Sequence, residues 1–271
     1  MKSIEDATSR ATSGASLYRE VSGAGPVALL IAGTPGDCGQ FAAVAAALGA
    51  DYTVVVYDRR GTSRSPRPAG WSATSVSEQA DDAAALLAEV TSDAALVFGT
   101  SNGAAVALEL ALRHPERVSA ILLHEMPLLS VLADPEPVGA MLGQLIDTAM
   151  REGGPSAALE AFVRFAYGDA LVDGLDAGLR DRMLENGEMV FSIEMPAFQS
   201  YRPDEAALDA MAVPAFVFVG EDQPVPFFAE AGRWLAARLD TTMLGSPGAH
   251  APHLSHPGEL AAAIAAHDPA R

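Results

Sequence analysis

The chain has 271 residues, of which 49% are hydrophobic and 19% charged, and its formal net charge at pH 7 is -18. This composition is typical of a folded globular protein, and the length allows one large domain or a domain with an insertion. Phosphate backbones repel so acidic a surface, which excludes nucleic acid as an expected partner.

The N-terminal stretch MKSIEDATSRATSGAS is polar and holds no apolar segment of signal-peptide length. No later run approaches the roughly 20 apolar residues of a membrane span. The single cysteine, Cys38, cannot form an internal disulfide and is expected to be a small buried hydrophobe. We therefore expect a cytoplasmic protein with no membrane partner, and the sequence leaves open whether it is a monomer or a homodimer.

Strand and helix patterns alternate through the first half of the chain. Two short strands around Ser13–Gly14 and Ser16–Val21 predict an N-terminal hairpin. Apolar runs of strand length and helical segments then follow in turn: Val27–Ala32, Gln40–Leu48, Thr53–Tyr57, Ser77–Val90, Ala94–Gly99 and Val118–His124. Strands that are apolar at every position are covered on both faces, so this pattern predicts a mostly parallel sheet flanked by helices.

The alternation stops between about Pro127 and Asp209, where only helical stretches separated by Gly and Pro occur. It resumes with the strand PAFVFVG, a helix at Phe227–Leu239, the short strand TTMLG and a last helix at Pro257–Ala266. The pattern predicts an α/β core made of residues 1–126 and 207–271. The all-helical block, residues 127–206, is predicted to rest on the sheet as a cap.

The stretch LVFGTSNGAAVALEL changes from a buried strand to a helix at Ser101, with Gly99 and Gly103 two residues to either side. Ligands of open α/β sheets collect at the carboxyl ends of strands, where this turn lies. A tight turn exposes the serine hydroxyl, and it points the N–H of Asn102, at a helix N-terminus, toward the group attacked. We interpret Ser101 as a nucleophile; the alternative is a serine N-cap with two packing glycines.

Four segments together resemble the α/β-hydrolase superfamily over nearly the whole chain: AGTPGD at Ala32–Asp37, YDRRGTSRS at Tyr57–Ser65, GTSNG at Gly99–Gly103, and GAHAPHLSHPGEL at Gly248–Leu260. The resemblance implies an α/β-hydrolase fold, a Ser-His-acid triad and a helical cap after the strand that follows the nucleophile helix. It also implies that the N–H of Thr34 joins that of Asn102 in an oxyanion hole.

A serine hydroxyl needs a base to take its proton during attack. Of six histidines, His250 follows the last strand in a glycine-rich loop and matches the position of the catalytic histidine in the family that the chain resembles. His253 and His256 follow it in the same segment and are expected to have a capping or positioning role instead of a catalytic one. His124 ends a strand and is expected to be buried and bonded to backbone.

The third member of the triad departs from the pattern of the family that the chain resembles. Its usual aspartate position, in GEDQPVP, is held by Gln223, whose neutral amide cannot stabilise an imidazolium as a carboxylate does. Asp222 could serve if the loop is shifted by one residue. Glu125 could serve from the end of the strand before the cap. We favour it because it is an ionisable group at the end of an otherwise apolar strand, where an unpaired charge would be costly to bury.

Serine rather than aspartate at the turn argues against the dehalogenases and epoxide hydrolases of this fold. We predict a hydrolase that cleaves an ester or lactone of a small to medium apolar compound through an acyl-enzyme on Ser101. The expected substrate-binding residues are Met126, Phe162, Phe165, Phe191 and Met195. No cofactor is expected, since no GxGxxG loop or metal-binding cluster appears. The alternatives are a non-hydrolytic ligand receptor or natural-product cyclase, an acyltransferase, and a hydrolase of carbon–carbon bonds.

Overall fold

The computed structural model describes residues 5–10 and 15–270. The strand predicted around Ser13–Gly14 lies outside them. The outer strand of the N-terminal hairpin is instead β1 (Glu5–Arg10), which pairs antiparallel with β2 (Ser16–Gly23). Its sequence, EDATSR, has neither the apolar alternation nor the β-branched content that predicts a strand, so its pairing with β2 could not be foreseen.

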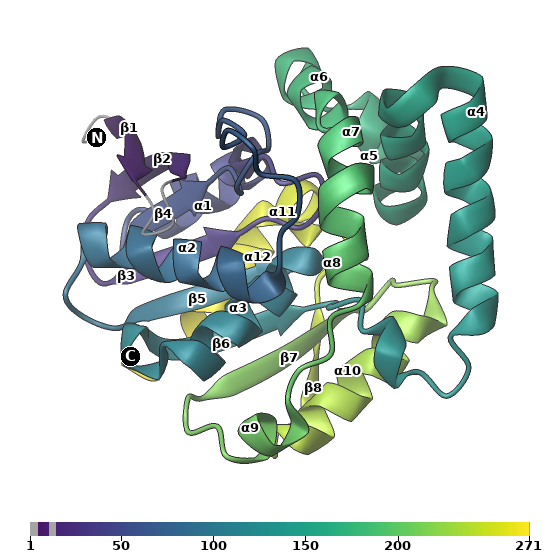
Figure 1. The fold of residues 1–271 in the computed structure, drawn as a ribbon. Helices are drawn as coiled ribbons and strands as arrows, with labels where there is room; N and C mark the ends of the chain where they lie inside the picture. The colour runs from purple at the N-terminus through teal and green to yellow at the C-terminus, as the bar shows by residue number, and fades with distance from the viewer. Residues whose placement is uncertain (1–4, 11–14, 271) are drawn as a thin grey trace.

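The eight strands of the described residues form one sheet in the order β1-β2-β4-β3-β5-β6-β7-β8 (Figure 1). The strand β2 is antiparallel to both neighbours, and every other pairing is parallel. The remaining strands have these bounds: β3 Val27–Ile31, β4 Thr53–Tyr57, β5 Ala95–Thr100, β6 Val118–His124, β7 Ala215–Gly220 and β8 Met243–Ser246. This arrangement confirms the predicted α/β class and its mostly parallel sheet.

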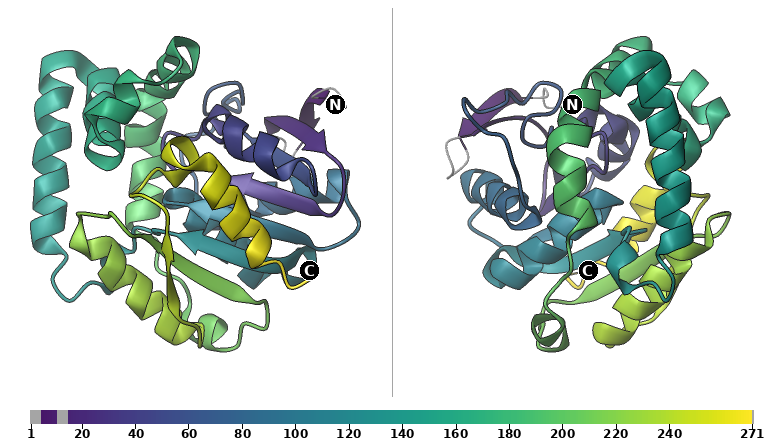
Figure 2. Two further views of the ribbon diagram at one scale, coloured as in Figure 1. Left: turned by 180° about the vertical axis from the view of Figure 1, so that it is seen from behind. Right: turned by 45° about the vertical axis from the view of Figure 1, so that its right-hand side comes forward.

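Helices cover both faces of the sheet, which explains why its central strands are mostly apolar at every position. Leu29 and Ile31 of β3 face one layer, and Ala28 and Leu30 face the other. The first layer contains α2 (Val76–Val90), α3 (Asn102–Arg113) and α10 (Pro226–Arg238). The second contains α1 (Ala42–Leu48) and α12 (Pro257–Ala266), which lie at the front when the molecule is seen from behind (Figure 2).

Short helical turns complete the core. They are η1 (Cys38–Phe41), η2 (Pro115–Arg117) and α11 (Pro252–Ser255). The helix α2 begins at Val76, one residue before the predicted start at Ser77. Ser75 is its N-cap, and the Ser75 hydroxyl accepts from the N–H of Glu78 at 2.9 Å.

All strands of the described chain lie outside residues 129–209, which we call the helical insertion. Its elements are η3 (Leu129–Val131), α4 (Glu136–Tyr167), α5 (Asp169–Asp173), α6 (Ala177–Glu185), α7 (Gly187–Met189), a π-helix (Val190–Glu194), α8 (Met195–Gln199) and α9 (Glu205–Asp209). The part from η3 to α8 lies beyond the carboxyl ends of the central strands, whereas α9 lies near the amino end of β7 (Figure 1). Within the described residues, no helix has both the length and the apolar character that crossing a membrane requires.

The helical insertion has a small hydrophobic core of its own, in which Leu159, Val163 and Met183 are buried. Its longest helix, α4, is broken at Gly154, whose φ of 74° is left-handed, just before Pro155. The predicted boundary at residue 206 falls inside α9.

Candidate active site

Ser101 sits between β5 and α3 in a strained backbone conformation, with φ 54° and ψ -129°. The glycines around it are required by close backbone packing. A Cβ on Gly99 would lie 2.3 Å from the carbonyl oxygen of Gly103, and one on Gly103 would lie 2.2 Å from that of Ile31. The Ser101 side chain makes no capping hydrogen bond to α3, so the alternative of a simple N-cap does not explain this turn.

The loop after β3 faces the turn at Ser101. A Cβ on Gly33 would come within 2.7 Å of the Ser101 Cβ, so the two segments are almost in backbone contact. The Asn102 side chain donates through Nδ2 to Thr34 Oγ1 at 2.9 Å and ties the loop to the first turn of α3. The first N–H groups of a helix have no intrahelical acceptor, which leaves the N–H of Asn102 available to a ligand. Thr34 and Asn102, the two residues predicted to form an oxyanion hole, are thus brought together.

His250 lies in the loop after β8, is 5% exposed, and its Nδ1 is 2.6 Å from Glu125 Oε2. Glu125 directly follows β6, has a φ of 46° and is 2% exposed. Its Oε1 accepts from the N–H of Gly220 at 2.8 Å, and its Oε2 also accepts from Gln223 Nε2 at 2.6 Å. The buried carboxylate therefore accepts three hydrogen bonds, one on Oε1 and two on Oε2.

Burial by itself would raise the pKa of Glu125. The hydrogen bond from His250, the positive charges that His124 and His250 can carry, and the N–H of Gly220 together hold that pKa below its ordinary value. The carboxylate is therefore ionised at neutral pH and accepts from His250 Nδ1–H. In the neutral imidazole this leaves Nε2 as the acceptor nitrogen.

The other candidate acid is placed differently. Asp222 is exposed, and its backbone N–H donates to the carbonyl oxygen of Gly248 at 2.9 Å. Glu125, and not Asp222, is the carboxylate bonded to His250.

Two further histidines are buried beside the site. His124 Nδ1 is 2.8 Å from Thr100 Oγ1, and burial lowers the pKa of His124 to about 4. His253 Nε2 is 3.4 Å from Gln40 Oε1, and burial lowers the pKa of His253 to about 3. Both are therefore neutral at physiological pH. The expectation that His124 bonds to backbone is wrong, because its partner is the Thr100 hydroxyl.

Ser101 and His250 line the same pocket, between the sheet and the helical insertion. Of the predicted substrate-binding residues, Phe162, Phe165 and Met195 line it too. Met126 and Phe191 do not. Met126 is buried in the core beneath, and Phe191 packs against the small core of the helical insertion.

The pocket has further apolar walls beyond Phe162, Phe165 and Met195. These are Pro127, Leu129, Leu142, Phe198, Phe227 and Phe228. The Phe228 ring stacks on His250, with ring centroids 4.6 Å apart. Phe227 and Phe228 open α10 at the carboxyl edge of the sheet, a position that could have marked them as pocket residues. No Asp, Glu, Lys or Arg is among the described residues that line this pocket.

The helical insertion is fastened to the loop after β3. The Arg59 guanidinium forms a fully buried ion pair with Glu194 of the π-helix, and its Nη2 donates to the Gly33 carbonyl oxygen at 3.2 Å. Arg182 of α6 pairs with Asp37 at 2.9 Å. These contacts hold the loop of Thr34 from the side of the helical insertion.

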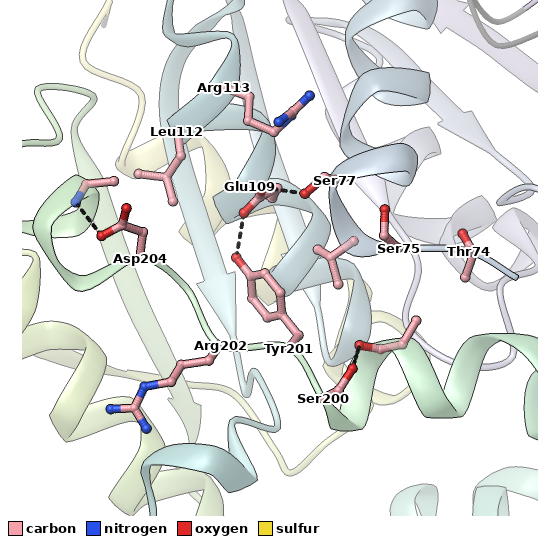
Figure 3. Close-up of a pocket in the computed structure, with 13 residues that line it drawn as sticks. Thr74, Ser75, Ser77, Glu109, Leu112, Arg113, Ser200, Tyr201, Arg202 and Asp204 are labelled. Carbon is pink, nitrogen blue, oxygen red and sulfur yellow. Dashed lines mark hydrogen bonds between the residues drawn. The ribbon is translucent and has the colours of Figure 1, made fainter.

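A second, larger cavity of about 490 Å³ lies between α2, α3 and the segment around Tyr201 (Figure 3). Glu109 accepts there from Ser77 Oγ at 2.7 Å and from the Tyr201 hydroxyl at 2.9 Å. Neither Ser101 nor His250 lines it. Its central carboxylate is occupied by these two donors, so the smaller pocket at Ser101 is the better candidate site.

No group of three or more His, Cys, Asp or Glu side chains placed to hold a metal ion occurs in the part of the chain that the structure describes.

Comparisons with known proteins place the chain in a family. A hydrolase of Bacillus subtilis (strain 168), YraK, whose function is uncharacterised, is 45% identical over 119 residues, only 44% of this chain and 44% of that protein. A pimeloyl-(acyl-carrier protein) methyl ester esterase of Aromatoleum aromaticum is 33% identical over 196 residues, which are 66% of this chain and 76% of the relative. The crystal structure of the enol-lactonase from Burkholderia xenovorans LB400 superposes with a TM-score of 0.78 at 19% identity, covering 96% of this chain and 98% of that one. Residues 28–263 match the model of the alpha/beta hydrolase family, and the chain belongs to that family.

Proposed function

We propose that this protein is a serine hydrolase that cleaves a carboxylic ester or a lactone of a small to medium apolar compound. The observation that carries the proposal is the buried Glu125–His250 hydrogen bond, with His250 lining the same apolar pocket as Ser101. Belonging to a family of hydrolases supports the class of reaction.

In the proposed reaction, Ser101 Oγ attacks the substrate carbonyl carbon while His250 Nε2 takes the hydroxyl proton. The charge that develops on the carbonyl oxygen is received by the backbone N–H groups of Thr34 and Asn102. The imidazolium then returns the proton to the leaving alcohol, and the ester becomes an acyl-enzyme on Ser101. Water, deprotonated by His250 in the same way, releases the acid and restores the serine.

Glu125 is assigned the third role. An ionised carboxylate bonded to Nδ1 holds the imidazole in the tautomer that can accept a proton at Nε2, and it stabilises the imidazolium formed during attack. The carboxylate contact supports hydrolysis over a non-hydrolytic receptor or cyclase, an alternative that was raised by the missing acid at Gln223.

The pocket supports an apolar acyl or alkoxy group of limited size. Its cavity volume is only about 60 Å³. Phe162, Phe165 and Met195, all from the helical insertion, line it. We infer that short-chain substrates fit directly and that longer ones require these helices to shift. The names of an esterase relative and of a lactonase neighbour support an ester or lactone.

Hydrolysis of a series of p-nitrophenyl esters, from acetate to decanoate, tests the proposal. We expect turnover to be fastest with the short esters and to fall with chain length. The matched control is Ser101→Ala, which leaves the pocket walls unchanged. If no ester is cleaved faster by the wild-type protein than by Ser101→Ala, the proposed function is wrong.

A further inference from the structure

Gln223 contacts the carboxylate of Glu125 in a fixed orientation. Its Oε1 accepts from the N–H of Val225 at 2.9 Å, so its amide nitrogen must point the other way, toward Glu125 Oε2 at 2.6 Å. A flipped amide would place an oxygen against the carboxylate and an NH₂ group against an N–H, losing both bonds. The loop geometry after β7 therefore dictates that residue 223 offers Glu125 a donor.

The donor from Gln223 falls on the oxygen that also accepts from His250. The other oxygen is held by the N–H of Gly220 at 2.8 Å. With both oxygens bonded, rotation of the carboxylate away from His250 would break two other hydrogen bonds at once. We propose that Gln223 is a positioning residue that locks Glu125 onto His250; this inference rests on the proposed function.

Gln223 stands where an aspartate is usual in the α/β-hydrolase family, and here its amide faces the carboxylate of Glu125. A glutamate at this position, which has the length of glutamine, would place an oxygen about where Gln223 Nε2 lies, 2.6 Å from Glu125 Oε2. Two carboxylates that close cannot both be ionised, so one would hold a proton at neutral pH. A glutamate at position 223 would therefore disturb the ionised carboxylate of Glu125, whereas the amide of Gln223 supports it.

Few titratable groups lie close enough to Glu125 to affect its charge. His124, next in the chain, and His250 are the titratable groups that perturb its carboxylate. Glu221 and Asp222 belong to the same loop as Gln223, but both are exposed. Gln223 itself does not line the substrate pocket. A substitution at 223 should therefore act through Glu125 and not through substrate contacts.

The test compares Gln223→Glu, which keeps the size and replaces the donor by an acceptor, with Gln223→Leu, which removes the donor. Asp222→Asn is the matched control in the same loop. Carbon-13 NMR titration of the Glu125 carboxyl is the first measurement, and kcat and KM for an ester are the second. Melting temperature verifies that each variant is folded.

We expect both substitutions at 223 to raise the pKa of Glu125, and Gln223→Glu to do so more strongly. Gln223→Glu should lower kcat about 10- to 100-fold, the rate equivalent of one hydrogen bond to a charged group, with KM unchanged. If Gln223→Glu leaves the pKa of Glu125 and kcat as they are in Asp222→Asn, Gln223 only fills space and the inference is wrong. The titration requires no turnover, so a wild-type protein without esterase activity would refute the proposed function and still decide whether Gln223 holds Glu125.

Discussion

Replacing Glu125 by glutamine removes the negative charge beside His250 and keeps the shape of the buried side chain. In the serine-protease template, the equivalent change from acid to amide lowers kcat by about four powers of ten, which corresponds to about 5.4 kcal/mol of activation free energy. The hydrogen bonds of this site lead to the same expectation for Glu125→Gln.

In the Glu125→Gln variant, the new amide oxygen would still accept from the N–H of Gly220, where Glu125 Oε1 lies at 2.8 Å in the wild type. The new NH₂ group would then face Gln223 Nε2 and His250 Nδ1, both of which act as donors to the wild-type carboxylate. His250 could accept from that amide only by moving its proton to Nε2. In that tautomer Nε2 cannot take the proton of Ser101, so the loss falls on the chemical step.

The assay is steady-state hydrolysis of a short p-nitrophenyl ester, with Asp222→Asn as the control. We expect kcat to fall by about three to four powers of ten in Glu125→Gln and to change less than about twofold in Asp222→Asn, because Asp222 is exposed. A Glu125→Gln enzyme within tenfold of the wild type, or a larger loss in Asp222→Asn, would refute the assignment of Glu125.

Three other outcomes are expected. The folded pKa of Glu125 is lowered, so its contribution to stability is present above the unfolded value of about 4.3 and is lost as pH falls through the folded pKa. The difference in unfolding free energy between wild type and Glu125→Gln, measured in urea, should therefore shrink in acid. A difference that grew in acid would contradict this linkage. Glu194→Ala should lower the free energy of unfolding by about 3–5 kcal/mol, because it leaves Arg59 buried with an unpaired charge. A loss below about 1 kcal/mol in chemical denaturation would show that water or another group replaces the carboxylate. Gly103→Ala should fail to give soluble folded protein, since its Cβ would meet the Ile31 carbonyl oxygen at 2.2 Å, and a normal melting temperature would mean that the turn can relax.

Local signals predicted the core well. Strands that are apolar at every position required cover on both faces, and the residues at their carboxyl ends had to lie at one edge of the sheet. That reasoning led to Ser101 and Glu125. The loop position of His250 came from the family resemblance, and the structure brings it against Glu125.

Features that depend on which face of a helix meets the sheet were not predictable. Met126 and Phe191 were expected in the pocket on apolar character alone, and long-range packing turns both elsewhere. Phe228 was missed although its place at the start of α10 could have marked it, because an apolar helix face has the same sequence pattern whether it packs on a sheet or lines a cavity. The role of Gln223 was hidden for a similar reason, since its partner is 98 residues away in the chain.

Covalent labelling of Ser101 tests the central claim most directly. A fluorophosphonate reacts with a serine that is activated by a neighbouring imidazole and leaves a stable adduct. Intact-mass and peptide mass spectrometry should find one equivalent of adduct on Ser101 in the wild type, none in Ser101→Ala, and much slower labelling in Glu125→Gln. An unmodified wild-type protein after prolonged exposure, or an adduct on a different residue, would contradict the assignment of Ser101 as the nucleophile.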